Sequence, residues 1–97
     1  MGESFPEEFE VKFNQHDPLF VISVVSGMVG LPIWTLRKLD EMGIVSPERL
    51  GKKTRCYSPH QVKKLNYVCY LLQERKVNIG GIKVILEIDA GKGDSNG

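Results

Sequence analysis

The chain has 97 residues, a formal net charge of +1, 41% hydrophobic residues and 26% charged residues, which are ordinary values for one small globular domain. No apolar run approaches the roughly 20 residues that a membrane-spanning helix needs, and the acidic N-terminus lacks the basic start and apolar middle of a signal peptide. These features argue against a membrane protein or a secreted precursor, so we expect a cytoplasmic protein.

The charge is unevenly distributed along the chain. Residues 1–17 hold five acids and one base, giving −4, whereas residues 34–76 hold ten bases and four acids, giving +6. A central concentration of positive charge indicates a polyanionic partner. We therefore divide the chain into a flexible acidic leader at 1–16, a folded domain at 17–89 and a disordered, glycine-rich tail at 90–97.

The first half of the folded domain predicts a short strand and two helices. A β-type run at 19–22 leads to Ser23, a residue type that suits the N-cap of a helix ending at Gly30. Pro32 fits the first turn of a second helix, which is expected to run to about Met42. Two helices joined by a Gly-Leu-Pro turn make a helix-turn-helix candidate.

Helical spacing assigns the faces of the second helix. Three apolar residues recur on one side and are expected to face the core: Ile33, Leu36 and Leu39. Trp34, the only tryptophan, has two alternatives, filling the core or touching a thymine methyl group, and partial burial is favoured. Arg37 is expected on the exposed side, where contact with a guanine edge or a phosphate is favoured over an ion pair with Glu41.

The second half predicts a two-stranded hairpin, or wing, followed by two more helices. Strand-like runs at 44–45 and 55–57 flank a loop with a basic tip. Ser58 then opens the longest helix, expected to end near Lys76, and Asn78 caps the last helix. The apolar stripe of the longest helix consists of Val62, Leu65, Val68 (or Cys69) and Leu72. Four helices and a small hairpin predict a mainly α, winged helix-turn-helix fold.

Motifs for catalysis or metal binding are not apparent. The sequence lacks a glycine-rich phosphate loop, a pair of carboxylates on one apolar face and a Ser/His/Asp arrangement. Cys56 and Cys69 do not have the spacing of metal ligands, and His16 and His60 lie far apart in the sequence. We therefore expect no enzymatic activity, no metal site and no cofactor.

An ordered set of residues resembles the MerR family of DNA-binding domains. The set comprises Thr35-Leu36-Arg37, Asp40, Gly43-Ile44-Val45-Ser46-Pro47, Arg49, Gly51, Arg55 and Tyr57-Ser58. The resemblance covers residues 19–89. Within the family it is closest to the heat-shock repressor branch, HspR, in Val21-Ile22-Ser23, Val45-Ser46-Pro47 and Val77-Asn78 with Gly81-Ile82-Lys83. It implies a winged helix-turn-helix transcription regulator that binds an inverted-repeat operator as a dimer. For this branch it further implies repression of chaperone genes, with the chaperone DnaK as a partner.

The resemblance also implies which residues contact double-stranded DNA. On the second helix, which would be the recognition helix, they are Thr35, Arg37 and Lys38. On or beside the wing they are Arg49, Lys52, Lys53, Arg55 and Tyr57. We expect Tyr57 to be half-buried, with its hydroxyl at the surface. Leu39 stands where the family usually has a tyrosine, so one expected phosphate contact is missing.

The subunit-pairing helix of the family is not seen after residue 89. We therefore expect a monomer in isolation that pairs only on DNA. Two alternatives stay open for the function. One is a small, excisionase-like factor that shapes DNA, and the other is a protein-binding module, such as a chaperone modulator, that kept the fold. The basic wing favours DNA binding over the second alternative.

Overall fold

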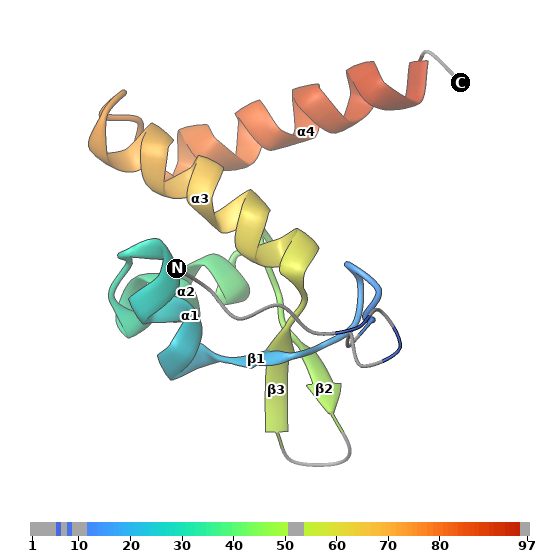
Figure 1. Ribbon diagram of the computed structural model, residues 1–97. Helices are drawn as coiled ribbons and strands as arrows, with labels where there is room; N and C mark the ends of the chain where they lie inside the picture. The colour runs from blue at the N-terminus through green and yellow to red at the C-terminus, as the bar shows by residue number, and fades with distance from the viewer. Residues whose placement is uncertain (1–5, 7, 9–11, 51–53, 96–97) are drawn as a thin grey trace.

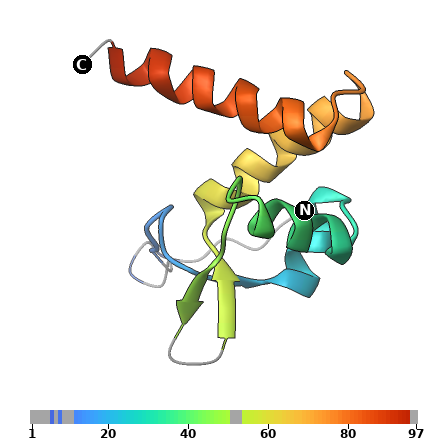
Figure 2. The same ribbon diagram turned by 180° about the vertical axis from the view of Figure 1, so that it is seen from behind.

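A computed structural model of the protein describes residues 6, 8, 12–50 and 54–95. Its elements are, in chain order, β1 (Phe20–Val21), α1 (Ile22–Val29), α2 (Ile33–Glu41), β2 (Glu48–Leu50), β3 (Thr54–Tyr57), α3 (Pro59–Gln73) and α4 (Ile79–Ser95). The β2–β3 hairpin and α4 lie at opposite ends of the molecule, with α3 between them (Figure 1). The view from behind shows the same arrangement (Figure 2). The predicted mainly helical winged helix-turn-helix fold is confirmed.

The three strands form one antiparallel sheet in the order β1-β3-β2. Phe20 lies opposite Tyr57 in the β1–β3 pair, and Arg49 lies opposite Arg55 in the β2–β3 pair. The expected short strand before the first helix therefore exists and pairs with the wing. Because β3 is paired along both edges, it connects the start of the helix-turn-helix to the hairpin.

The first strand of the wing begins later than the sequence predicted. The strand expected at 44–45 is wrong, since β2 begins at Glu48 and these two residues lie in bends between α2 and β2. The amides of Ile44 and Val45 both donate to the carbonyl of Leu39, over 2.9 and 3.4 Å, and both side chains are buried. An apolar, β-branched pair suits a buried turn as well as a strand, so local preference did not separate the two.

The start of α1 also differs from the prediction. Its N-cap is Val21, and no side chain caps it, so Ser23 lies within the helix and is not its N-cap. β1 runs directly into α1, because pairing with β3 holds the backbone extended as far as Val21. The predicted end is confirmed: Gly30 adopts a left-handed conformation, with φ of 74°, and its amide donates to the carbonyl of Ser26.

Helix α3 forms the centre of the core. Ser58 is its N-cap, as predicted, and the capping is reciprocal: the Gln61 amide donates to Ser58 Oγ, and the Ser58 amide donates to Gln61 Oε1. The buried residues of α3 are Val62, Leu65, Val68 and Leu71. Leu72, expected in that stripe, is only partly buried, and α3 ends at Gln73, before the expected Lys76.

Regular structure and hydrogen bonds extend into both terminal segments that were expected to be flexible, where the structure describes them. Helix α4 continues to Ser95, although disorder had been expected from residue 90. Glycines cost about 1 kcal/mol each in a helix, but extending a helix that is already formed is far easier than starting one. Near the N-terminus, the carbonyl of Gln15 accepts a 2.8 Å bond from the His60 amide. The end of the leader is therefore joined to α3, and the ring centres of His16 and His60 lie 4.9 Å apart.

Replacement of Ser58 by alanine should lower the free energy of unfolding by about 1 kcal/mol, because it removes the side-chain half of the capping box. Urea unfolding followed by circular dichroism measures this change. Ser23→Ala is the matched control, because Ser23 is exposed and caps no helix. It should stay within about 0.5 kcal/mol of the parent protein. A larger loss for Ser23→Ala than for Ser58→Ala would contradict the assigned helix starts.

Candidate nucleic-acid interface

Helix α2 buries one side and exposes a basic side. Leu36 and Leu39 are fully buried, whereas Arg37 and Lys38 are exposed. The turn before α2 is held by a 2.6 Å hydrogen bond from Ser26 Oγ to the carbonyl of Leu31. Leu31 is itself buried, so the turn is anchored from both α1 and the core. The basic side of α2 is thereby held rigidly against the rest of the domain.

Two residues of α2 lie on the side opposite to the one expected. Thr35, expected to contact DNA, is only 5% exposed, and Trp34, expected to be partly buried, is 71% exposed. The inward-facing stripe of α2 comprises Thr35, Leu36 and Leu39, and Ile33 is only partly buried. Packing against α1 therefore turns the helix so that the tryptophan faces solvent.

The wing presents two arginines directly opposite each other. Arg49 on β2 and Arg55 on β3 are register partners, so their side chains leave the same face of the hairpin, and both residues are exposed. Like charges at directly opposed positions destabilise a strand pair unless an anion lies between or beside them. Lys52 and Lys53, predicted at the tip, lie outside the described residues. The described part of the wing thus already concentrates positive charge on one face.

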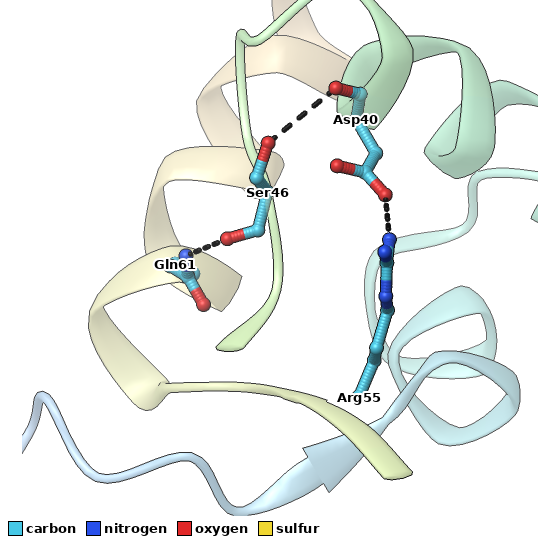
Figure 3. A network of polar contacts seen from close by, with 4 residues as sticks. All are labelled: Asp40, Ser46, Arg55 and Gln61. Carbon is cyan, nitrogen blue, oxygen red and sulfur yellow. Dashed lines mark hydrogen bonds and ion pairs between the residues drawn. The ribbon is translucent and has the colours of Figure 1, made fainter. Parts of the chain in front are cut away.

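A polar network joins this face of the wing to α2 and α3 (Figure 3). Arg55 Nη1 donates to Asp40 Oδ2 over 2.7 Å, with the two side chains 51% and 24% exposed. Ser46 Oγ donates to the Asp40 carbonyl over 3.4 Å, and Gln61 Nε2 donates to the Ser46 carbonyl over 2.6 Å. Sequence reasoning noticed Asp40 without giving it a role, and it missed Gln61. Only its position three residues after Ser58 could have identified that glutamine.

Arg37 does not form the ion pair with Glu41 that was its alternative role. Glu41 instead lies 4.0 Å from the ammonium group of Lys38, and both side chains are largely exposed. Such a surface pair contributes about 0–1 kcal/mol. Within the described ranges no ion pair is seen for Arg37. Its guanidinium is therefore available to an external partner.

A groove of about 580 Å³ separates α2 from the sheet. Arg37, Asp40 and Glu41 line it from α2, and Thr54 and Arg55 line it from β3. Arginines from two different elements thus face one concave surface. The groove also has two acids, so its charge is mixed and not uniformly positive.

Tyr57 also lines the groove. Its hydroxyl was expected at the surface, but the side chain is buried. It is only 1% exposed, and its buried hydroxyl has no hydrogen-bond partner within the described residues. Burial raises the pKa of this phenol above 10.0, the nearby Asp40 charge raises the pKa further, and Arg55 opposes the increase. Tyr57 lies on the central strand opposite Phe20, which explains why it packs inward.

The described residues contain no group of three or more His, Cys, Asp or Glu side chains that could hold a metal ion. In the same ranges, no helix has the length and apolar character required to cross a bilayer. Cys56 and Cys69 are free thiols, and Cys56 is buried on β3.

A helix-turn-helix with an exposed basic helix, beside a hairpin with opposed arginines, defines this chain as a winged helix-turn-helix protein of the nucleic-acid-binding class. The family described as MerR HTH family regulatory protein matches residues 20–88, and the chain belongs to that family. A Streptomyces coelicolor protein named as a heat shock protein, HspR, is 37% identical over 78 residues. The match covers 80% of this chain and 52% of that protein, so the chain spans about half the length of its relative.

Replacement of Tyr57 by phenylalanine should reduce the loss of unfolding free energy that occurs as the pH rises into the alkaline range. As the pH rises past 10.0, the unfolded chain loses the phenol proton while the folded protein, with its raised pKa, retains it. Unfolding is then favoured, so the parent protein loses stability over this range. Urea unfolding at neutral pH and on either side of pH 10.0 should show a shallower loss for Tyr57→Phe.

At neutral pH, Tyr57→Phe should be at least as stable as the parent, because the hydroxyl it removes is buried with no hydrogen-bond partner in the part of the chain that the structure describes. Tyr70→Phe is the matched control, since it removes a phenol hydroxyl from an exposed tyrosine of α3. Identical alkaline slopes for Tyr57→Phe and the parent would show that the Tyr57 hydroxyl is hydrated in the folded protein.

Proposed function

We propose that this domain binds a specific duplex DNA sequence and acts in a bacterial transcription regulator of the heat-shock repressor type. The observation that carries the proposal is the common groove of α2 and β3, into which each contributes an exposed arginine. A recognition helix and a wing that share one concave surface match the convex form of a duplex, with bases read from the helix and phosphates held by the wing. Membership of the MerR family and the resemblance to HspR support this proposal.

In the proposed complex, α2 enters the major groove and the wing lies along the adjacent sugar-phosphate backbone. Arg37, for which no ion pair is seen in the described ranges, is the residue proposed to bond a guanine edge. Phosphate contacts are assigned to Lys38, Arg49, Lys52, Lys53 and Arg55. Thr35 and Tyr57 are assigned to packing, because neither side chain reaches the surface.

Asp40 gives Arg55 a fixed direction in this proposal. The ion pair uses Nη1 of the guanidinium, which has five N–H donors in total. The remaining donors can bind a phosphate while Asp40 still holds the side chain beside α2. An arginine held in place loses less side-chain entropy on binding than a free one. Asp40 would therefore position a DNA contact without touching DNA.

We further propose that the domain acts in the cytoplasm, without catalysis, cofactor or metal. The resemblance to the HspR branch also leads us to propose a DnaK-type chaperone as a protein partner. Mixing purified DnaK-type chaperone with the protein, with and without its preferred duplex, tests this directly by size-exclusion chromatography. Separate elution under both conditions would remove the chaperone from the proposal and leave DNA binding unaffected.

Selection from a random pool of duplexes, followed by gel-shift titration, tests the central function. Enrichment of a defined sequence is the expected result. Bending of duplexes without enrichment would support the excisionase-like alternative. Absence of binding at low salt would support a protein-binding module that kept the fold.

Arg55→Ala should weaken binding to all duplexes and flatten the dependence of log K on log salt by about 0.9 for the phosphate contact that it removes. Arg37→Ala should weaken binding to the selected site by about 1–3 kcal/mol more than to random DNA, if this side chain bonds a base. Fluorescence anisotropy with labelled duplexes at several salt concentrations measures both effects.

Lys83→Ala is the matched control for both variants, since it removes one exposed positive charge from α4, at the opposite end of the molecule from the wing (Figure 1). Equal losses for Arg37→Ala on selected and random DNA would assign Arg37 to a phosphate. Losses for Lys83→Ala as large as those for Arg55→Ala would indicate general charge attraction in place of a defined interface.

We propose that the 97-residue chain is a monomer in free solution and pairs only on DNA. The exposed large apolar side chains of α4 in the described residues are Val84 and Ile88, flanked by charged Lys83 and Glu87. A stable dimer buries at least about 1,200 Å², far more than two such side chains provide. Sedimentation equilibrium at several micromolar concentrations should give the monomer mass. A dimer that persists on dilution would contradict the proposal.

A further inference from the structure

The side chain of Trp34, at the start of α2, is exposed to solvent. It is 71% exposed, more than any other large apolar side chain that the described residues contain. A tryptophan that packs inside a protein commonly buries roughly 150–250 Å². Neither aromatic ring contact found in the described ranges involves Trp34. The indole therefore contributes little to the packing of the domain's core.

Trp34 is placed where a recognition helix contacts bases. It is the second residue of α2, directly after Ile33 and the N-cap Pro32, and the first residues of a recognition helix are those that meet base edges. Arg37 and Lys38 follow three and four positions later, so all three side chains share one exposed strip of the helix. The indole is therefore next to the cations assigned above to DNA.

The chemistry of the indole selects one feature of the major groove. Its ring carries no charge for a phosphate and a single N–H donor, so its main surface is apolar. The apolar group that base pairs present in the major groove is the C5 methyl of thymine. On the basis of the proposed DNA-binding function, we propose that Trp34 is a specificity-determining residue that contacts the C5 methyl of a thymine in the operator.

The charges around Trp34 favour DNA over an apolar protein surface as its partner. Docking the indole onto such a surface would also remove water from Arg37 and Lys38 beside it, which is costly without nearby anions. Phosphates provide those anions on both sides of the major groove. Only a polyanion with exposed methyl groups can therefore contact the indole and neutralise the two cations of this strip at the same time.

Replacing thymine by uracil removes only this methyl group. The duplex used is the one enriched by selection, with each thymine replaced by uracil in turn, and affinity is measured by anisotropy. The parent protein should lose about fourfold in affinity at one position, the loss expected for one methyl group. Trp34→Ala should bind the thymine and uracil duplexes equally well there. Tyr70→Ala, which removes an exposed aromatic ring from α3, should retain the parent's discrimination.

Tryptophan fluorescence provides a second measurement, because Trp34 is the sole tryptophan of the chain. Its emission should shift to shorter wavelength or be quenched on binding the selected duplex, and Trp34→Phe should keep part of the methyl discrimination. The inference is overturned if Trp34→Ala discriminates thymine from uracil as well as the parent does, or if the emission is unchanged in the complex. If the parent protein selects no sequence, the proposed function is overturned, and the inference about Trp34 is overturned with it. This result is distinct from loss of thymine discrimination by a parent protein that does select a sequence.

Discussion

The interface of this domain depends on the pairing of β3 along both of its edges. On one edge β3 bonds to β1, which continues without a break into α1, and on the other it bonds to β2. The strand ends at Tyr57, and the next residue, Ser58, caps α3. One four-residue strand thereby joins the helix-turn-helix, the wing and the central helix. Removing either ladder would let the wing move relative to α2, and the shared groove would lose its shape.

The polar network supplies the orientation that the strand pairing leaves open. Gln61 uses one end of its amide for the cap of α3 and the other for the carbonyl of Ser46, and Asp40 connects the same region to Arg55. Each exposed contact contributes little stability alone. Their main effect is to orient a side chain, because they hold a wing arginine toward α2. The buried hydroxyl of Tyr57 at the same junction, which has no hydrogen-bond partner among the described residues, is a cost of about 1–3 kcal/mol that the surrounding packing must offset.

Much of the fold could be predicted because the local signals were of kinds that tertiary contacts seldom override. The Ser-Pro start of α3, the glycine ending α1 and the burial of Leu36 and Leu39 on α2 each have a local physical cause, and each was confirmed. The errors at Ser23 and at residues 44–45 have a different origin. A serine suits an N-cap or an exposed helical site, and an Ile-Val pair suits a strand or a buried turn, so neighbours decide between them.

The sequence by itself determined the fold class, the family and the central concentration of positive charge, because these follow from residue types and their order. Tertiary structure alone decided which of the candidate residues can meet a partner. A helix has only one outward strip, and its direction depends on packing, which turned Trp34 to the solvent and Thr35 to the interior. Strand register likewise placed Arg49 opposite Arg55 and brought Arg55 to Asp40, fifteen residues away in the chain. Such relations depend on distances in space, which the order of residues does not contain.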